Sequence, residues 1–192
     1  MHEDSVVALN RSAELVARYT GVPNRDFDAL RRSDRIVPSD LVLALRHPNP
    51  RVRFDSLALL DHLADESCFD AMIEATRDPV PRVRRMAAHA LGCVRCKGDC
   101  VPSDIGHALI TLALTDPAWR VRCEASISLA QQPATDRSRE TLARVAAGDP
   151  HPTVRERAAW ALRIHEGQPW SYGRRKASSD YAPRDEGHRG LT

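Results

Sequence analysis

The sequence predicts an all-α fold, an α-solenoid of about four stacked helical hairpins preceded by an N-terminal helical cap. The main observation is a recurring pattern of Asp-Pro, then Val-Arg, then an Ala- and Leu-rich run, with Val-Arg pairs that begin at Val52, Val83, Val121 and Val154. These pairs are 31, 38 and 33 residues apart, a period typical of stacked helical repeats. Aromatic residues make up only 5% of the 192 residues. The core must therefore consist mostly of Ala, Leu and Val, which suits closely packed helices.

Residues 1–37 are expected to form the N-terminal cap. Their apolar side chains recur three or four positions apart and form one stripe of an amphipathic helix: Val6, Leu9, Ala13, Val16 and Tyr19. Gly21 and Pro23 follow the stripe and are typical of a helix end. Such a helix can cover the apolar end that a repeat array would otherwise expose.

Residues 38–166 are expected to form the repeats, each as a pair of helices. A proline marks each turn, because a helix interior does not tolerate it: Pro48, Pro79, Pro117 and Pro150. A second proline opens most second helices, where its missing N–H does no harm, and Trp119 takes that place in the third copy. The second-helix core is represented by Val83, Ala87, Ala88 and Leu91. The last first helix is expected to bury Ala143, Ala146 and Ala147.

The Asp-Pro, Val-Arg and Ala-Ala-x-Ala-Leu elements together resemble the HEAT repeat, specifically the HEAT-like repeats of the phycobilisome-lyase type. The resemblance covers residues 38–166 and implies a right-handed solenoid of about four HEAT-like hairpins. It also implies a ladder in which turn aspartates meet helix arginines of adjacent repeats: Asp78, Asp116 and Asp149 with Arg53, Arg84, Arg122 and Arg155. The first copy departs from this pattern, because His47 stands where an aspartate is expected.

Residues 167–192 lack the repeat period and are rich in Gly, Ser, Pro and charged residues. This composition is typical of a flexible C-terminal tail. The aromatic residues Trp170, Tyr172 and Tyr181 leave open the alternative that the tail docks into a groove.

The formal net charge of the chain is +2. Residues 168–192 contain five basic and three acidic side chains, so the rest of the chain is formally neutral. A neutral body disfavours general nucleic-acid binding, which needs a basic face to displace counterions. No apolar run is long enough to span a membrane, and the start lacks the layout of a secretory signal. We therefore expect a cytoplasmic protein without a membrane partner, whose five cysteines are reduced.

Three cysteines, Cys93, Cys96 and Cys100, lie within eight residues and form the main candidate metal site. Zinc would need a fourth ligand, for which His89 is one helical turn away and His107 is a second choice. The cluster lacks the paired cysteine knuckles of a zinc ribbon, so a surface loop with reduced thiols or a redox-sensitive pair is favoured. We expect no cofactor, with zinc as the open alternative.

The sequence contains no glycine-rich phosphate loop and no Gly-x-Ser-x-Gly. It also has no paired carboxylates that recur on one face. HEAT-like deoxyhypusine hydroxylases hold iron through His-Glu pairs, but here the only such neighbours, His2-Glu3 and His165-Glu166, do not stand at second-helix starts. We therefore expect that the protein is not an enzyme.

In a HEAT-like stack the second helices line the concave side. Subtracting the expected core and ladder residues leaves a mixed surface with scattered apolar side chains: Phe54, Arg85, Met86, His89, Glu124, Ile127, Arg157 and Trp160. Such a surface suits a protein or peptide partner better than a phosphate backbone, and this favours a scaffold or adaptor. The alternative is a purely structural role, in which these residues contact one another or the tail.

Two other functions stay open at this point. One is nucleic-acid binding through basic side chains of the repeats and the tail: Arg82, Arg85, Arg120, Arg174, Arg175 and Lys176. The other is an accessory subunit of a lyase-type or modifying enzyme, which would handle a bound cofactor or peptide.

Overall fold

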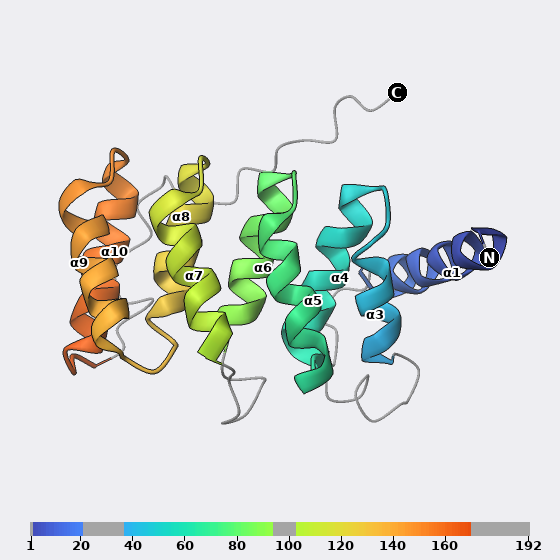
Figure 1. Ribbon diagram of the computed structural model, residues 1–192, viewed down its shortest axis with the longest axis horizontal. Helices are drawn as coiled ribbons and strands as arrows, with labels where there is room; N and C mark the ends of the chain where they lie inside the picture. The colour runs from blue at the N-terminus through green and yellow to red at the C-terminus, as the bar shows by residue number, and fades with distance from the viewer. Residues whose placement is uncertain (1, 21–36, 94–102, 170–192) are drawn as a thin grey trace.

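The computed structural model describes residues 2–20, 37–93 and 103–169. Over these ranges the chain is helical and contains no strand. Figure 1 shows helix pairs placed side by side along the long axis of the molecule, from the blue N-terminal helix to the orange last pair. The predicted all-α solenoid is confirmed.

The repeats are formed by successive helix pairs. The first two are α3 (Pro38–Ala44) with α4 (Pro50–Leu63), and α5 (Phe69–Glu74) with α6 (Pro81–Gly92). Short 3-10 helices, η1 (Glu66–Cys68) and η2 (Ala75–Arg77), flank α5. The last two pairs are α7 (Ser103–Thr115) with α8 (Trp119–Leu129), and α9 (Asp136–Gly148) with α10 (Pro152–His165).

The turn within each pair is closed by a side chain at its first position. The Oδ1 atoms of Asp78, Asp116 and Asp149 each accept a hydrogen bond from the backbone N–H two residues later, at 2.8 Å. His47 does the same in the first turn, where its Nδ1 accepts from the N–H of Asn49 at 3.0 Å. These local bonds stabilise the turn and fix the position of each aspartate for contact with the neighbouring repeat.

The second helices, α4, α6, α8 and α10, pack against one another more closely than the first helices do. They therefore lie on the inner side of the stack. Small residues permit this approach, most clearly where Gly92 of α6 lies against Ser128 of α8. The second helices thus form the inner surface on which the candidate partner-binding residues stand.

The buried side chains follow the predicted pattern in most repeats. Val83, Ala87, Ala88 and Leu91 of α6 are buried, as expected. The prediction for α9 is wrong, because Ala143 and Ala147 are exposed and Ala146 is only half-buried. The core of that helix is formed instead by Leu142 and Val145. These larger side chains lie on a different face of the helix, and burying them removes more apolar area from water.

The helix α1 (His2–Thr20) precedes the repeats and packs against α3 and α4. Its contact face includes the buried Val16 and Ser12, whereas Val6 and Val7 are exposed. This is the place that the sequence assigns to a cap. None of the helices in the described ranges is long and apolar enough to cross a bilayer.

Candidate partner-binding surface

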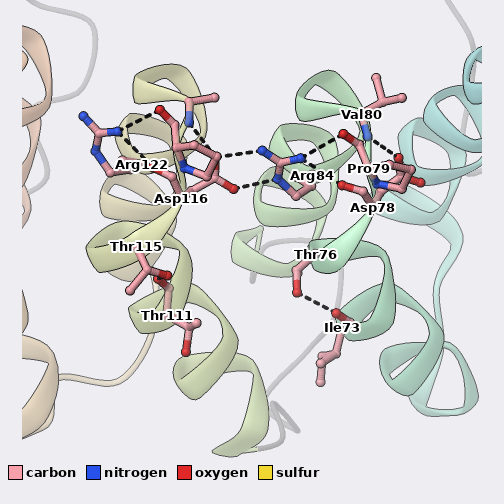
Figure 2. Close-up of polar contacts among 12 residues, drawn as sticks. Ile73, Thr76, Asp78, Pro79, Val80, Arg84, Thr111, Thr115, Asp116 and Arg122 are labelled. Carbon is pink, nitrogen blue, oxygen red and sulfur yellow. Dashed lines mark hydrogen bonds and ion pairs between the residues drawn. The ribbon is translucent and has the colours of Figure 1, made fainter.

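The ladder of arginines and aspartates connects adjacent repeats, and its geometry repeats almost unchanged. Arg84 Nε and Nη2 donate to Asp116 Oδ2 and Oδ1 at 2.6 and 2.9 Å. Arg53 pairs in the same way with Asp78, and Arg122 with Asp149. The expected ladder is therefore present for these three pairs, and Figure 2 shows Arg84 between two consecutive turns.

Each ladder arginine also supports its own turn. Nη1 of Arg84 donates to the carbonyl oxygens of Asp78 and Pro79 at 2.9 and 3.2 Å. The hydrogen bond to Asp116 raises the pKa of Arg84 against the opposing effect of burial. Burial would raise the pKa of Asp149, but hydrogen bonds from Arg122 and the His151 N–H hold it below its ordinary value. Bidentate, charge-assisted bonds of this kind fix orientation as well as charge, so Arg53, Arg84 and Arg122 stabilise the stack and are not available to a ligand.

Two of the predicted surface residues meet across repeats. His89 of α6 donates from Nδ1 to Glu124 Oε1 of α8 at 2.9 Å. On the other side of the ring, His89 Nε2 lies 3.6 Å from Asp61 Oδ2 of α4. The imidazole thus lies between two carboxylates from different repeats, and its side chain stays 48% exposed while both carboxylates are largely buried.

The sequence prediction missed Asp61. It stands three residues after Ala58, the residue of the first repeat that aligns with His89. Since residues three apart share one face of a helix, this spacing was a signal that could have found it.

Charged groups gather beside this histidine around Cys123. Arg157 and Arg85 lie close enough for their charges to lower the pKa of the Cys123 thiol, and Glu124 acts in the opposite direction. Burial is the largest cause and raises the pKa of Cys123 to about 11. Such a thiol is protonated at neutral pH and is a poor nucleophile or metal ligand. Arg85, Glu124 and Arg157 thus all lie near Cys123.

The apolar members of the predicted set differ in exposure. Phe54 is half-buried, with the Arg82 guanidinium carbon 4.3 Å from the centre of its ring, a favourable cation–π distance. Met86 is half-buried against the core. Ile127 and Trp160 are only 7% and 8% exposed, so they support the surface from below. Their predicted contact with a partner stays a prediction.

A second aromatic contact joins the last two repeats. The rings of Trp119 and His151 stack with centroids 3.8 Å apart and planes 5° apart. The guanidinium of Arg120 lies over the same indole, 4.6 Å from its centre. Trp119 was the sequence feature that could have indicated this contact, because it replaces the proline found at this position in the other repeats.

The cysteine cluster falls mostly outside the described residues. Cys93 is half-buried at the end of α6, whereas Cys96 and Cys100 belong to the segment 94–102 that is not described. His89, the expected fourth ligand, is engaged with Glu124 and Asp61. Within the described ranges no group of three His, Cys, Asp or Glu side chains could hold a metal ion. Zinc binding by the cysteines stays a prediction.

Comparison with known families agrees with this geometry. The family profile described as HEAT repeats matches residues 38–100 and 107–170. The first matched segment contains the pairs α3/α4 and α5/α6, and the second contains α7/α8 and α9/α10. No curated protein matches the sequence significantly.

Proposed function

Because the chain belongs to the HEAT-repeat proteins, which are commonly protein-interaction scaffolds, we propose that it is a non-enzymatic scaffold or adaptor. Its partner is a protein or peptide that lies along the inner surface formed by α4, α6, α8 and α10. The central part of this surface is the region around His89, where side chains from three repeats converge.

The observation that carries the proposal is the mixture of anchored charges and half-buried apolar side chains on this surface. Met86 and Phe54 offer apolar contact area. Arg85, Arg157 and Glu124, whose charges act on the Cys123 thiol, add charges of both signs to the second helices. Protein interfaces combine apolar contacts with polar groups in this way, and pre-positioned side chains lose little entropy when a partner binds.

The same charges favour a protein over a nucleic acid. A phosphate backbone requires cations that can release its counterions. Arg53, Arg84 and Arg122 are committed to aspartates, and Arg51 is paired with Asp55 at 2.6 Å. Glu124 and Asp61 add negative charge to the centre of the surface. Nucleic-acid binding therefore ranks second, and strongly salt-dependent binding of tRNA or duplex DNA would support it instead.

Binding without catalysis is supported by the chemistry of the same region. The thiol of Cys123 is buried and its pKa is raised to about 11, which disfavours nucleophilic chemistry. His89 contacts the carboxylates of Glu124 and Asp61. It thereby connects neighbouring repeats at the inner surface, rather than activating a nucleophile. An accessory role beside an enzyme would use the same surface to hold that enzyme or its peptide substrate.

A photo-crosslinking experiment tests the proposal. The photoreactive amino acid p-benzoylphenylalanine replaces Met86 on the inner surface or, as a control, the exposed Ala147 on α9. In native cells we expect a discrete crosslinked protein from position 86 and not from position 147.

Matched charge reversals sharpen this test. Arg85→Glu should abolish the crosslink from position 86, whereas Arg144→Glu on the exposed side of α9 should leave it unchanged. Identical crosslinks from positions 86 and 147, or equal effects of the two reversals, would contradict binding on the inner surface. Trp160 is unsuitable for such a test, because it is only 8% exposed and its substitution would disturb packing.

A further inference from the structure

Arg155 occupies the ladder position of the last repeat, but among the described residues no aspartate side chain pairs with it. Its Nη1 donates to the carbonyl oxygens of Asp149 and Pro150 at 2.7 and 3.2 Å. The three preceding ladder arginines make the same bonds to their own turns. Each of those also donates from Nε and Nη2 to the aspartate of the next turn. In the described part of the chain no carboxylate meets the corresponding edge of Arg155.

Two further positions on the same helix face distinguish α10 from the earlier second helices. In each earlier second helix the residues four and seven positions after the ladder arginine are buried: Leu57 and Leu60, Ala88 and Leu91, Ser126 and Leu129. Their equivalents on α10 are Ala159 and Leu162, and both are only half-buried. Arg155 itself is half-buried, as are Arg53 and Arg122, whereas Arg84 is buried. The face of α10 that carries Arg155, Ala159 and Leu162 is thus equivalent to a face that is buried in each earlier second helix, where another second helix packs next to it.

We propose that the outer face of α10, defined by Arg155, Ala159 and Leu162, is a docking surface for a helical hairpin of another polypeptide. The turn of that hairpin presents an aspartate to the Nε–Nη2 edge of Arg155, as Asp116 does to Arg84. The two bonds of Nη1 to the turn hold the guanidinium in place before the partner arrives. A bidentate bond to a pre-oriented guanidinium gives both affinity and register.

A second copy of this chain does not fit as the partner. Its turn aspartates, Asp78, Asp116 and Asp149, are already bonded to arginines of their own chain. Its first turn carries His47, whose Nδ1 accepts from the Asn49 N–H. In addition, α1 packs against the first helix pair. The occupant that fits is therefore a different polypeptide with a carboxylate in its turn.

The first test uses a synthetic peptide with the sequence of residues 135–167, which contains one hairpin and the turn residue Asp149. It is titrated into the full-length protein labelled with ¹⁵N-arginine, and the Nε–Hε signal of Arg155 is assigned with the variant Arg155→Lys. We expect a saturable shift of this signal, and at least tenfold weaker binding of a peptide that carries Asp149→Asn. An unmoved Arg155 signal, or equal binding of both peptides, overturns the proposal.

A covalent version removes any dependence on the folding of the free peptide. A second copy of residues 135–167 is inserted after Gly167 of the full chain, with or without Asp149→Asn in the inserted copy. We expect a higher unfolding midpoint for the insertion with the aspartate, and the variant Arg155→Gln should remove the difference. Equal midpoints in the presence of Arg155 contradict the proposal.

Other occupants give distinct results, each of which overturns the proposal. A dimer detected by analytical ultracentrifugation and lost in Arg155→Gln would identify a second copy. A shift of the Arg155 signal of the isolated protein on neutralising Asp180, Asp185 and Glu186 would identify the chain's own acidic residues. A monomer whose Arg155 signal ignores these substitutions and responds to the aspartate peptide supports the proposal.

Discussion

Gly92 of α6 lies directly against Ser128 of α8, so that a Cβ atom on Gly92 would stand 2.3 Å from the Ser128 Cβ and 2.8 Å from its Cα. Two second helices therefore touch almost backbone to backbone at this point. The contact joins the repeats that flank the longest spacing in the sequence. Its neighbour Gln132 strengthens the contact, since its Nε2 donates to the Gly92 carbonyl at 3.3 Å.

We predict that Gly92→Ala destabilises the protein. Replacing a helical glycine by alanine normally stabilises a helix by about 1 kcal/mol, but overpacking a closed contact costs about 1–3 kcal/mol. Because the nearest atoms belong partly to the Ser128 backbone, we expect the cost to prevail, with a net loss of about 2 kcal/mol in the free energy of unfolding. Urea denaturation measures this change.

Gly106 of α7 is the matched control, because a Cβ there would meet no atom within 4 Å. Gly106→Ala should stabilise the protein by about 0.5–1 kcal/mol. Adding Ser128→Gly to Gly92→Ala removes the Ser128 Cβ and Oγ atoms but not the backbone contact, so it should restore part of the lost stability. If neither alanine substitution changed the free energy of unfolding, α6 and α8 would not approach each other as closely as the structure shows.

The second prediction concerns the most buried ladder pair, Arg84 and Asp116, whose side chains are 11% and 2% exposed. Asp116→Asn keeps an Oδ1 acceptor for the Ala118 N–H but leaves Arg84 without its charged partner. Removing one member of a buried ion pair costs about 3 kcal/mol or more, and guanidinium denaturation should show a loss of that size.

Asp136→Asn provides the comparison, since Asp136 pairs with Arg139 at the surface. Exposed ion pairs contribute about 0–1 kcal/mol, so this change should be small. Similar losses for Asp116→Asn and Asp136→Asn would show that the ladder does not stabilise the stack.

The third prediction is a pH dependence that originates at His165. Burial lowers the pKa of its imidazole below 6.5 against opposing hydrogen bonds to the Leu129 and Gln132 backbone. Neutral His165 donates from Nε2 to the Leu129 carbonyl at 2.8 Å, and its Nδ1 lies 3.1 Å from Ser138 Oγ. The unfolded chain therefore binds a proton at His165 more readily than the folded chain does.

The free energy of unfolding therefore decreases as the pH falls below about 6.5. The decrease ends once the pH lies below the lower pKa that His165 has in the folded state. His165→Gln should lose this part of the pH dependence while it leaves contributions from other histidines in place. Chemical denaturation of both proteins between pH 8 and pH 4.5 measures the difference. Parallel curves for the two proteins over this range would refute the prediction.

The fourth prediction concerns thiol reactivity. Cys68 and Cys123 are buried, and burial is the largest cause that raises the pKa of each thiol. Because the thiolate is the reactive form, both cysteines should resist iodoacetamide at pH 8 in the native protein. Peptide mass mapping after a timed reaction should find them unmodified, and the same reaction in urea should modify all five cysteines. Rapid native labelling of Cys123 would contradict its placement.

The sequence by itself determined the helix pairs and the ladder. Proline fixes where each turn and second helix begins, and the resemblance to HEAT-like repeats implied bonds between residues 25–32 positions apart, such as Arg53 with Asp78 and Arg84 with Asp116. Similar units that stack in one way repeat the same contact, so a resemblance recognised from the repeated pattern was enough to assign the ladder residues.

Only the tertiary structure decided which side chains remain at the inner surface. Trp160 and Ile127 are buried, His89 lies between Asp61 and Glu124, and Leu142 replaces Ala143 in the core. These outcomes depend on the rotation of each helix about its own axis and on the closeness of neighbouring pairs, as at Gly92 and Ser128. Periodicity along one helix does not contain that information, because packing between hairpins sets it.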